Sequence, residues 1–134
     1  MTQNEARRRV ELILNGFGEH TAWPDLSSKP VYVSRHKVGE PDSSGSPPRK
    51  MNAVFFEYSK ELPHDYNERI ELLLEALGNE DGVRRIISAY GAAQKWIRLW
   101  IPVRSSEWSE EGHLSEKTLG RLCNLGLDLE FWYT

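Results

Sequence analysis

The chain has 134 residues, a length at which a single domain can bury enough surface to fold without disulfides or metals. Hydrophobic residues make up 39% and charged residues 28%, and the five tryptophans are a high count, so a chain that is disordered throughout is excluded. The net charge of −3 at pH 7 disfavours binding to a phosphate backbone, because nucleic-acid-binding proteins usually carry a basic face.

Cysteine content and hydropathy indicate the cellular compartment in which the protein is expected to reside. Cys123 is the single cysteine, so it can form no internal disulfide and leaves no cysteine cluster for zinc, which favours a reducing environment. The residues from Met1 to Arg9 are polar and no long apolar run follows, so a secretory signal is not expected. No stretch approaches the ~20 apolar residues of a membrane span. We therefore expect a cytoplasmic protein that does not contact membranes.

Hydrophobic periodicity predicts the elements. Strict alternation of apolar and polar residues is typical of strands, and apolar residues three and four apart are typical of helices. In chain order the sequence predicts a half-buried strand over 8–15, a short edge strand at 31–33, a strand over 53–58, a helix over 66–77, a helix over 79–90, a strand over 94–103, a short helix from Ser115 through Leu122 and Cys123, and a strand over 127–133.

Helix ends carry recognisable capping residues. Asp65 stands three residues before Glu68, which is the spacing of a capping box, and Ser115 is placed to cap the last helix. Asn79 is expected to cap the second helix. Gly126 stands where a helix ends in the left-handed conformation.

The segment 19–50 is the least regular part of the chain. It holds five prolines, and the run 39–48 is rich in Pro, Gly and Ser. Proline has no N–H to donate, so this run is expected to hold neither a strand ladder nor a helix. We interpret 39–50 as a flexible, exposed loop.

The order of elements suits an α+β fold. We expect one domain spanning residues 1–134, with a mainly antiparallel sheet of four to five strands and two to three helices on one face of the sheet.

The C-terminal third resembles a known bacterial family. The sequence LSEKTL at 114–119, followed by LGLDLEF at 125–131, is similar to the closing signature of the family called domain of unknown function 4279. The aromatic strand at 54–58 and the helix at 66–77 follow the family's order, whereas 17–48 lacks the helix that the family usually has there. The resemblance implies a small bacterial cytosolic protein, and some members look like immunity partners of secreted toxins. The family has no established catalytic residues that could be assigned to positions of this chain.

Residues with catalytic chemistry do not form a site in this sequence. His20, His36, His64 and His113 lie in predicted loops or at a helix start, without the spacing of a helical zinc pair. Cys123 is expected to face inward and to serve packing. We therefore expect no catalytic residues, no cofactor and no metal.

Strand alternation also predicts a second, aromatic side of the sheet. If Ile97, Leu99 and Ile101 lie beneath the helices together with Leu127, Leu129 and Phe131, the residues between them point the other way. Those residues, which Phe55 and Glu57 are expected to join, are Trp96, Arg98, Trp100, Asp128, Glu130 and Trp132. Tryptophan, tyrosine and arginine dominate protein-binding hot spots. The alternative is that the segment 17–50 folds over this side and makes it a second core.

These observations favour a binding protein over an enzyme. The leading hypothesis is a non-enzymatic, cytoplasmic immunity protein that occludes a cationic toxin domain, since complementary charge speeds encounter. A second contact strip is predicted in the acidic segment at Glu107, Trp108, Glu110 and Glu111. Two alternatives stay open. One is a small-molecule-binding or weakly enzymatic domain with a pocket between the sheet and the N-terminal half, and the other is a structural subunit of a homodimer.

Overall fold

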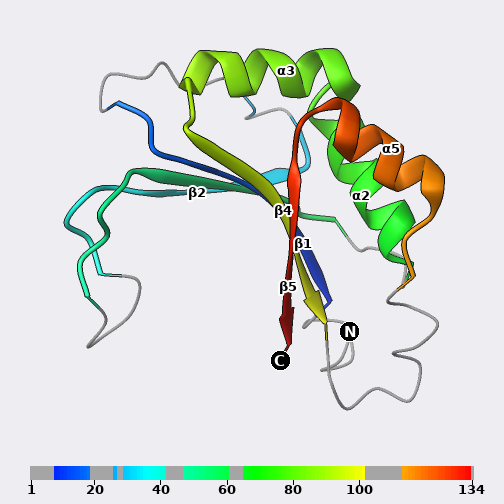
Figure 1. Ribbon diagram of the computed structural model, residues 1–134, viewed down its shortest axis with the longest axis horizontal. Coiled ribbons are helices and arrows are strands. Elements are labelled where there is room, and N and C mark those ends of the chain that lie inside the picture. Colours follow the sequence, from blue (N-terminus) through cyan, green and yellow to red (C-terminus); the bar gives the residue numbers. More distant parts are fainter. Residues whose placement is uncertain are drawn as a thin grey trace.

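The computed structural model describes residues 8–18, 26, 29–41, 47–60, 65–101 and 113–133. Within them the chain forms five strands and three helices (Figure 1), which confirms the predicted α+β class. The elements are β1 (Arg9–Asn15), β2 (Val31–His36), β3 (Ala53–Tyr58), α2 (Tyr66–Ala76), α3 (Asn79–Tyr90), β4 (Gln94–Ile101), α5 (Glu116–Asn124) and β5 (Asp128–Tyr133).

The strands form one open sheet in the order β2-β3-β1-β4-β5. Each neighbouring pair is antiparallel except β4 and β5, which are parallel. A parallel pair needs a crossover connection, and α5 lies in that connection. The sheet is thus mainly antiparallel, as predicted, with β1 at its centre and β2 and β5 at its edges.

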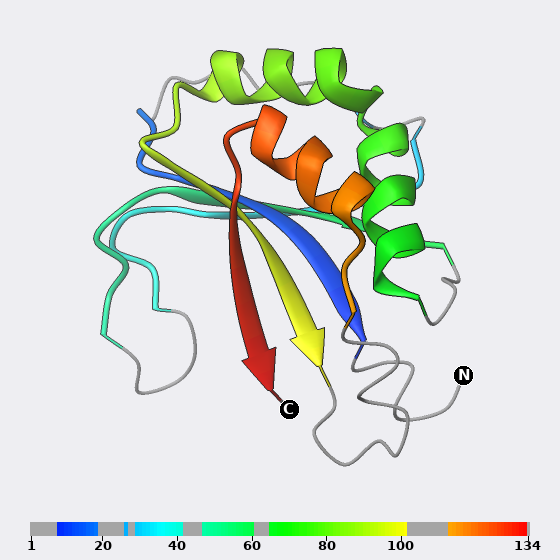
Figure 2. The same cartoon turned by 45° about the vertical axis from the view of Figure 1, so that its right-hand side comes forward.

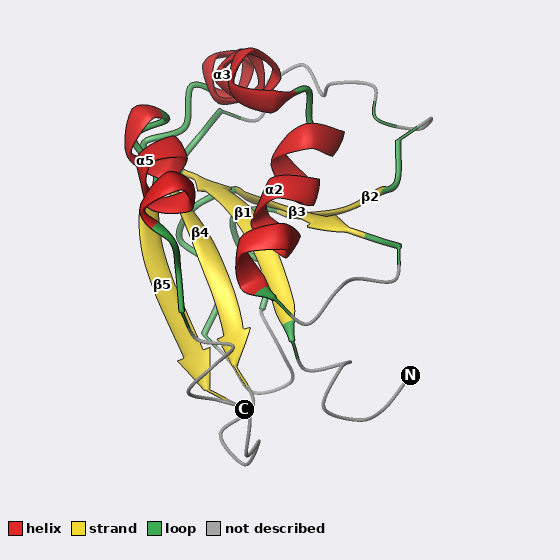
Figure 3. Ribbon diagram, turned by 90° about the vertical axis from the view of Figure 1, so that its right-hand side faces the viewer, coloured by secondary structure: helices red, strands yellow, loops and turns green. Residues whose placement is uncertain are grey.

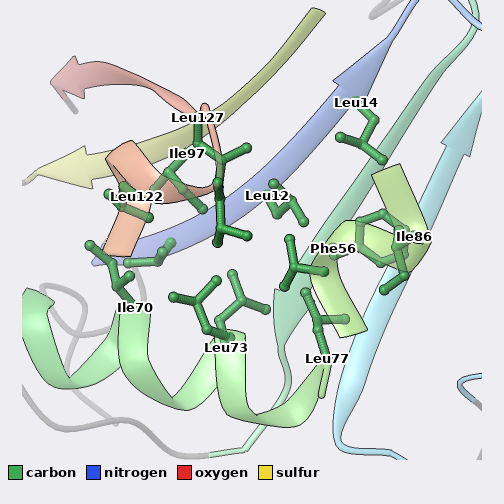
Figure 4. Packing of buried hydrophobic residues seen from close by; sticks show 14 of the residues in the cluster. Leu12, Leu14, Phe56, Ile70, Leu73, Leu77, Ile86, Ile97, Leu122 and Leu127 are labelled. Carbon is green, nitrogen blue, oxygen red and sulfur yellow. The ribbon is translucent and has the colours of Figure 1, made fainter. Parts of the chain in front are cut away.

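The three helices lie on one side of the sheet (Figures 2 and 3). Beneath them the strands contribute Leu12, Phe56 and Ile97, which meet Leu73 of α2 and Leu122 of α5 in a continuous core (Figure 4). These five side chains are at most 2% exposed. Each such side chain contributes about 1.5–3 kcal/mol when it is fully buried, so this contact fixes which face of every strand points to the helices.

Two of the predicted caps are confirmed. The Asp65 side chain accepts a hydrogen bond from the backbone N–H of Asn67 at 3.0 Å, and Ser115 accepts one from that of Thr118 at 3.2 Å. Gly126 has a φ of +66°, which is the left-handed conformation expected after α5.

The predicted cap at Asn79 is wrong. The residue before α3 is Gly78, with a φ of +96°, and no side chain caps the helix. Asn79 itself is the first helical residue and has a positive φ of 57°. The turn from α2 into α3 is so short that both residues take left-handed geometry, and Asn79 cannot stand outside the helix as a cap.

The prediction of a half-buried first strand is also wrong, because β1 is buried on both faces. Glu11 is 3% exposed and Ile13 is 0% exposed, although both point away from the helices. The reason is the central position of β1. Ile13 lies between Phe55 of β3 and Trp96 of β4 in the sheet register, and large neighbours cover it from both sides.

The described residues of the run 39–48 belong to no helix or strand, as predicted, but the two sides of the run still pair locally. The pairing of β2 with β3 continues outward, with hydrogen bonds from Gly39 N to Arg49 O at 2.9 Å and from Arg49 N to Glu40 O at 2.8 Å. An isolated bridge joins Pro41 and Pro48 beyond them. The donors are non-proline residues, so the prolines do not interrupt the pairing.

Three side chains lie elsewhere than predicted. Cys123 is exposed, because α5 buries Thr118 and Leu122 and the next residue turns outward by about 100°. His36 is the last residue of β2 and not a loop residue. Phe131 is 44% exposed, because the second half of β5 runs beyond α5 (Figure 2).

Candidate functional site

The side of the sheet opposite the helices carries the residues that alternate with the core residues, and we call this set the aromatic face. Its members on the five strands are Tyr32, Ser34 and His36 of β2, Phe55 and Glu57 of β3, Arg9, Glu11 and Ile13 of β1, Trp96, Arg98 and Trp100 of β4, and Asp128, Glu130 and Trp132 of β5. None of the three described helices lies on it (Figure 3).

The structure places together the strand residues that the sequence predicted to share this side. They are Trp96, Arg98, Trp100, Asp128, Glu130 and Trp132, which pair across β4 and β5, and Phe55 and Glu57 join them. The other four predicted contact residues, Glu107, Trp108, Glu110 and Glu111, lie outside the described residues.

Arg98 is the centre of the part of the face that lies over β4 and β5. Its guanidinium carbon lies 4.3 Å from the ring centre of Trp132 and 5.8 Å from that of Trp100. The two indoles are themselves 5.0 Å apart. Arg98 Nε donates to Glu130 at 2.5 Å, and the Arg98 side chain is only 12% exposed. The cation therefore holds both indoles and the carboxylate in one arrangement before any partner binds.

A second charged cluster lies over β1 and β3. Arg9 Nη2 donates to Glu57 Oε2 at 2.8 Å and lies 3.6 Å from Glu11 Oε2. Its hydrogen bonds to Glu57 raise the pKa of Arg9 above the ordinary value, against the opposing effect of partial burial. The other Glu11 oxygen, Oε1, accepts a hydrogen bond from the indole N–H of Trp100. Trp100 thereby links the two halves of the aromatic face.

The face is hollowed in two places. A cleft of about 280 Å³ lies over β1, β2 and β3, lined by Arg9, Glu11, Tyr32, Ser34, His36, Phe55, Glu57 and Trp100. A cleft of about 330 Å³ lies over β4 and β5, lined by Gln94, Trp96, Asp128, Leu129 and Glu130. Pockets for drug-sized ligands usually measure about 300–1,000 Å³, so the first cleft lies just below this range and the second lies at its lower end.

Where the structure describes the segment 17–50, its apolar residues do not cover the aromatic face. Phe17, Leu26, Val31 and Val33 all pack against the core on the helix side. Tyr32 points to the aromatic face and is 62% exposed. Trp23, another large residue of this segment, lies outside the described residues.

Sequence reasoning missed the contributions of β1 and β2. Arg9, Glu11, Tyr32 and His36 are absent from the set of residues that strand alternation predicts for this side. Their alternation with Val10, Leu12, Val31 and Val33 was the available signal. It could not be used without the sheet order, which puts β1 between β3 and β4 and adds β2 at the edge.

The described residues hold few groups suited to catalysis. No group of three or more His, Cys, Asp or Glu side chains is arranged for a metal ion in the part of the chain that the structure describes. His36 Nε2 is 2.8 Å from Ser34 Oγ, and its ring is 5.0 Å from that of Phe55. Burial raises the pKa of Tyr90 to about 12, but Tyr90 belongs to the core on the helix side.

Comparisons with known proteins add no relative. No family model, no curated protein and no solved structure matches this chain. The resemblance to domain of unknown function 4279 therefore stays a prediction. Among the described helices, none combines the length and the apolar character that crossing a membrane requires.

Proposed function

We propose that the protein is a non-enzymatic, cytoplasmic binding module that docks a protein partner on the aromatic face. The observation that carries this proposal is the cluster of Arg98, Trp100, Trp132 and Glu130, which is held by internal contacts on the side of the sheet away from the helices. Partly exposed tryptophans beside an arginine are the residue types that dominate binding energy at interfaces.

Rigidity of this cluster supports binding. Ordering a flexible side chain costs about 0.5–1.5 kcal/mol on association, and a side chain already held in place avoids most of that cost. Trp132 is 44% exposed, yet its indole N–H donates to Glu130 and its ring contacts Arg98. It thus offers apolar surface to a partner without a large loss of conformational freedom.

The most specific form of the proposal is a bacterial immunity protein that blocks a cationic toxin domain. Two features support it: the resemblance in the C-terminal third, and the net charge of −3, which favours encounter with a basic partner. A gene for a secreted toxin immediately upstream is the expected genomic setting, and a metabolic operon there would argue against this form.

Affinity capture followed by calorimetry tests the docking surface. The partner captured from the native cell is purified and titrated with the wild-type protein, Trp132→Ala and Leu119→Ala. Leu119 is the matched control, because it is 41% exposed but lies on α5. We expect Trp132→Ala to weaken binding about 30-fold, the loss of 2 kcal/mol typical of a hot spot, and Leu119→Ala to change it little. Equal affinities for the two variants would refute docking on the aromatic face.

A second candidate function, a homodimer, is favoured by one observation at the edge strand β5. Phe131, Trp132 and Tyr133 are consecutive, and each is at least 44% exposed. An exposed apolar edge strand is a template for pairing with another strand. Sedimentation of the purified protein tests this candidate. A dimer that Trp100→Ala or Phe131→Lys dissociates would support it, and a monomer at high concentration would exclude it.

A further inference from the structure

The carboxylate of Glu11 lies in the middle of the sheet, with one oxygen that accepts a hydrogen bond and one that takes part in an ion pair. The side chain is 5% exposed, and Oε1 accepts the indole N–H of Trp100. The nearest cation to Oε2 is Arg9 Nη2 at 3.6 Å, which is too long for a hydrogen bond. This distance is that of an ion pair, so the charge of Glu11 is partly balanced. Glu11 also lines the cleft over β1, β2 and β3, and the described residues give Oε2 no hydrogen bond. A group that enters the cleft can therefore donate one to it.

The cleft over β1, β2 and β3 carries an excess of negative charge. Its lining includes two carboxylates, Glu11 and Glu57, and one guanidinium, Arg9, so the carboxylates outnumber the arginines by one. Arg9 is directed at Glu57, with which it makes three hydrogen bonds of 2.8–3.2 Å. The excess charge therefore stays with Glu11.

Two further cations lie close to this cleft without lining it. Arg98 forms an ion pair with Glu130, so the charges of these two side chains cancel. The guanidinium of Arg49 lies 5.5 Å from the ring centre of Phe55, at the margin of the cleft. Arg98 is the register partner of Glu11 on β4. Among the described residues, however, no hydrogen bond or ion pair joins Glu11 to Arg98 or to Arg49.

The walls of the cleft are aromatic. Arg9 lies 5.6 Å from the ring centre of Trp100, and Arg98 lies 5.6 Å from that of Phe55, so both rings already take part in cation–π contacts. Tyr32 is 62% exposed, and no described cation lies over its ring. Cations within about 6 Å of an aromatic ring centre are attracted to its face. A third cation entering the cleft would meet Tyr32 and then Glu11.

From these contacts we infer that the cleft is a subsite for a basic side chain of the protein partner, whose N–H groups reach Glu11 Oε2 while its stem lies against Tyr32. This inference rests on the proposed function and names the chemistry of the partner's anchor. The volume of about 280 Å³ admits one long side chain, and the surplus carboxylate selects lysine or arginine over neutral residues.

Nuclear magnetic resonance titration with capped amino acids tests the subsite without the partner. The probes are N-acetyl-arginine amide and N-acetyl-lysine amide, and N-acetyl-citrulline amide is the neutral control with nearly the shape of arginine. We expect saturable, millimolar binding of at least one cationic probe, with the indole N–H signal of Trp100 shifting most because that group is bonded to Glu11. The neutral control is expected to leave the signal in place.

Variants assign the effect to the cleft. Glu11→Gln removes the surplus charge and is expected to weaken probe binding about tenfold, the effect of losing a hydrogen bond to a charged group. Because Glu11 is buried, this variant can also unfold the protein. Glu57→Gln is the second variant, since Glu57 is more exposed, and it should weaken binding severalfold. Glu68→Gln, on the exposed side of α2, is the matched control and should bind the probes as the wild type does.

The outcomes separate this inference from the proposed function. Equal shifts with citrulline and arginine probes, or no shift at all, would overturn the basic subsite and leave docking through Trp132 untouched. Probe binding that survives Glu57→Gln unchanged would also overturn it. Conversely, the probes could shift the Trp100 signal while the partner binds Trp132→Ala with wild-type affinity. That result would contradict only the proposed docking surface.

Discussion

Replacing Arg98 with methionine is the perturbation that most directly tests whether the aromatic face is preorganised. Methionine keeps much of the stem of arginine and removes the guanidinium. The change deletes the 2.5 Å ion pair with Glu130 and the contacts with the rings of Trp132, Trp100 and Phe55 at 4.3, 5.8 and 5.6 Å.

The expected loss of stability is about 2 kcal/mol. Cation–π contacts contribute about 0.5–1 kcal/mol at exposed sites and about 2 kcal/mol where they are desolvated, and the Arg98 side chain is 12% exposed. The ion pair adds less than about 1 kcal/mol, because Glu130 is 38% exposed and solvent screens it. In urea, with a slope of about 2 kcal/mol per molar, the unfolding midpoint should fall by about 1 M.

Two further variants give this measurement its controls. Arg84→Met removes an exposed arginine whose 3.6 Å ion pair with Asp81 joins one helical turn, and it should cost less than about 0.5 kcal/mol. Arg98→Lys keeps the charge but loses the planar group that stacks on the rings, so its midpoint should fall between those of Arg98→Met and the wild type. An Arg98→Met midpoint no lower than that of Arg84→Met would refute the argument.

Three other predictions concern the scaffold. Gly82→Ala places a Cβ atom 2.1 Å from the carbonyl oxygen of Leu77 and should cost about 1–3 kcal/mol in urea unfolding. Asn52→Ala removes a buried amide that donates to Phe17 O at 2.9 Å and accepts a backbone N–H beyond β2, and it should cost about 1–3 kcal/mol. Tyr90, whose pKa burial raises to about 12, should stay neutral in the folded protein while the unfolded chain ionises near pH 10, so stability should fall between about pH 10 and 12.

Each of these predictions has its own control. Gly120 is helical, and an added Cβ there meets nothing within 4 Å, so Gly120→Ala should stabilise by about 0.5–1 kcal/mol. Gly82→Ala behaving like Gly120→Ala would contradict the steric argument. Tyr90→Phe should abolish the extra loss of stability at high pH, and an unchanged pH profile would show that Tyr90 is not its cause. Asn52→Ala with wild-type stability would show that its two hydrogen bonds are not needed.

Local sequence patterns were sufficient for the elements and for part of the site. Alternation along β4 and β5 depends only on the period of a strand, so it correctly put Trp96, Trp100 and Trp132 opposite the core. Ser115 and Gly126 were correctly placed for the same reason, because a cap depends on the few residues around it.

The remaining part of the site depends on contacts between distant segments. The hydrogen bond from Trp100 to Glu11 joins residues 89 apart in the chain, and the one from Arg9 to Glu57 joins residues 48 apart. Both follow from the sheet order, in which β1 lies between β3 and β4. Periodicity shows which side a residue takes but not which strand lies beside it. The burial of Glu11 between β3 and β4 could therefore not be predicted from the sequence.

The errors in the helices have local physical causes. Cys123 follows Leu122 directly, and one residue is enough to turn a side chain from the core to solvent. At Asn79 a residue type that favours caps stands one position too late, because Gly78 already occupies the end of the turn.

Mapping of the captured partner's contact surface by nuclear magnetic resonance tests the central claim most directly. Indole N–H signals of Trp100 and Trp132 report on the aromatic face, and backbone amides of Arg84 and Ser88 report on exposed positions of α3. We predict that the partner shifts or broadens both indole signals and leaves the α3 amides in place. Changes confined to α3, with both indoles unaffected, would contradict the account.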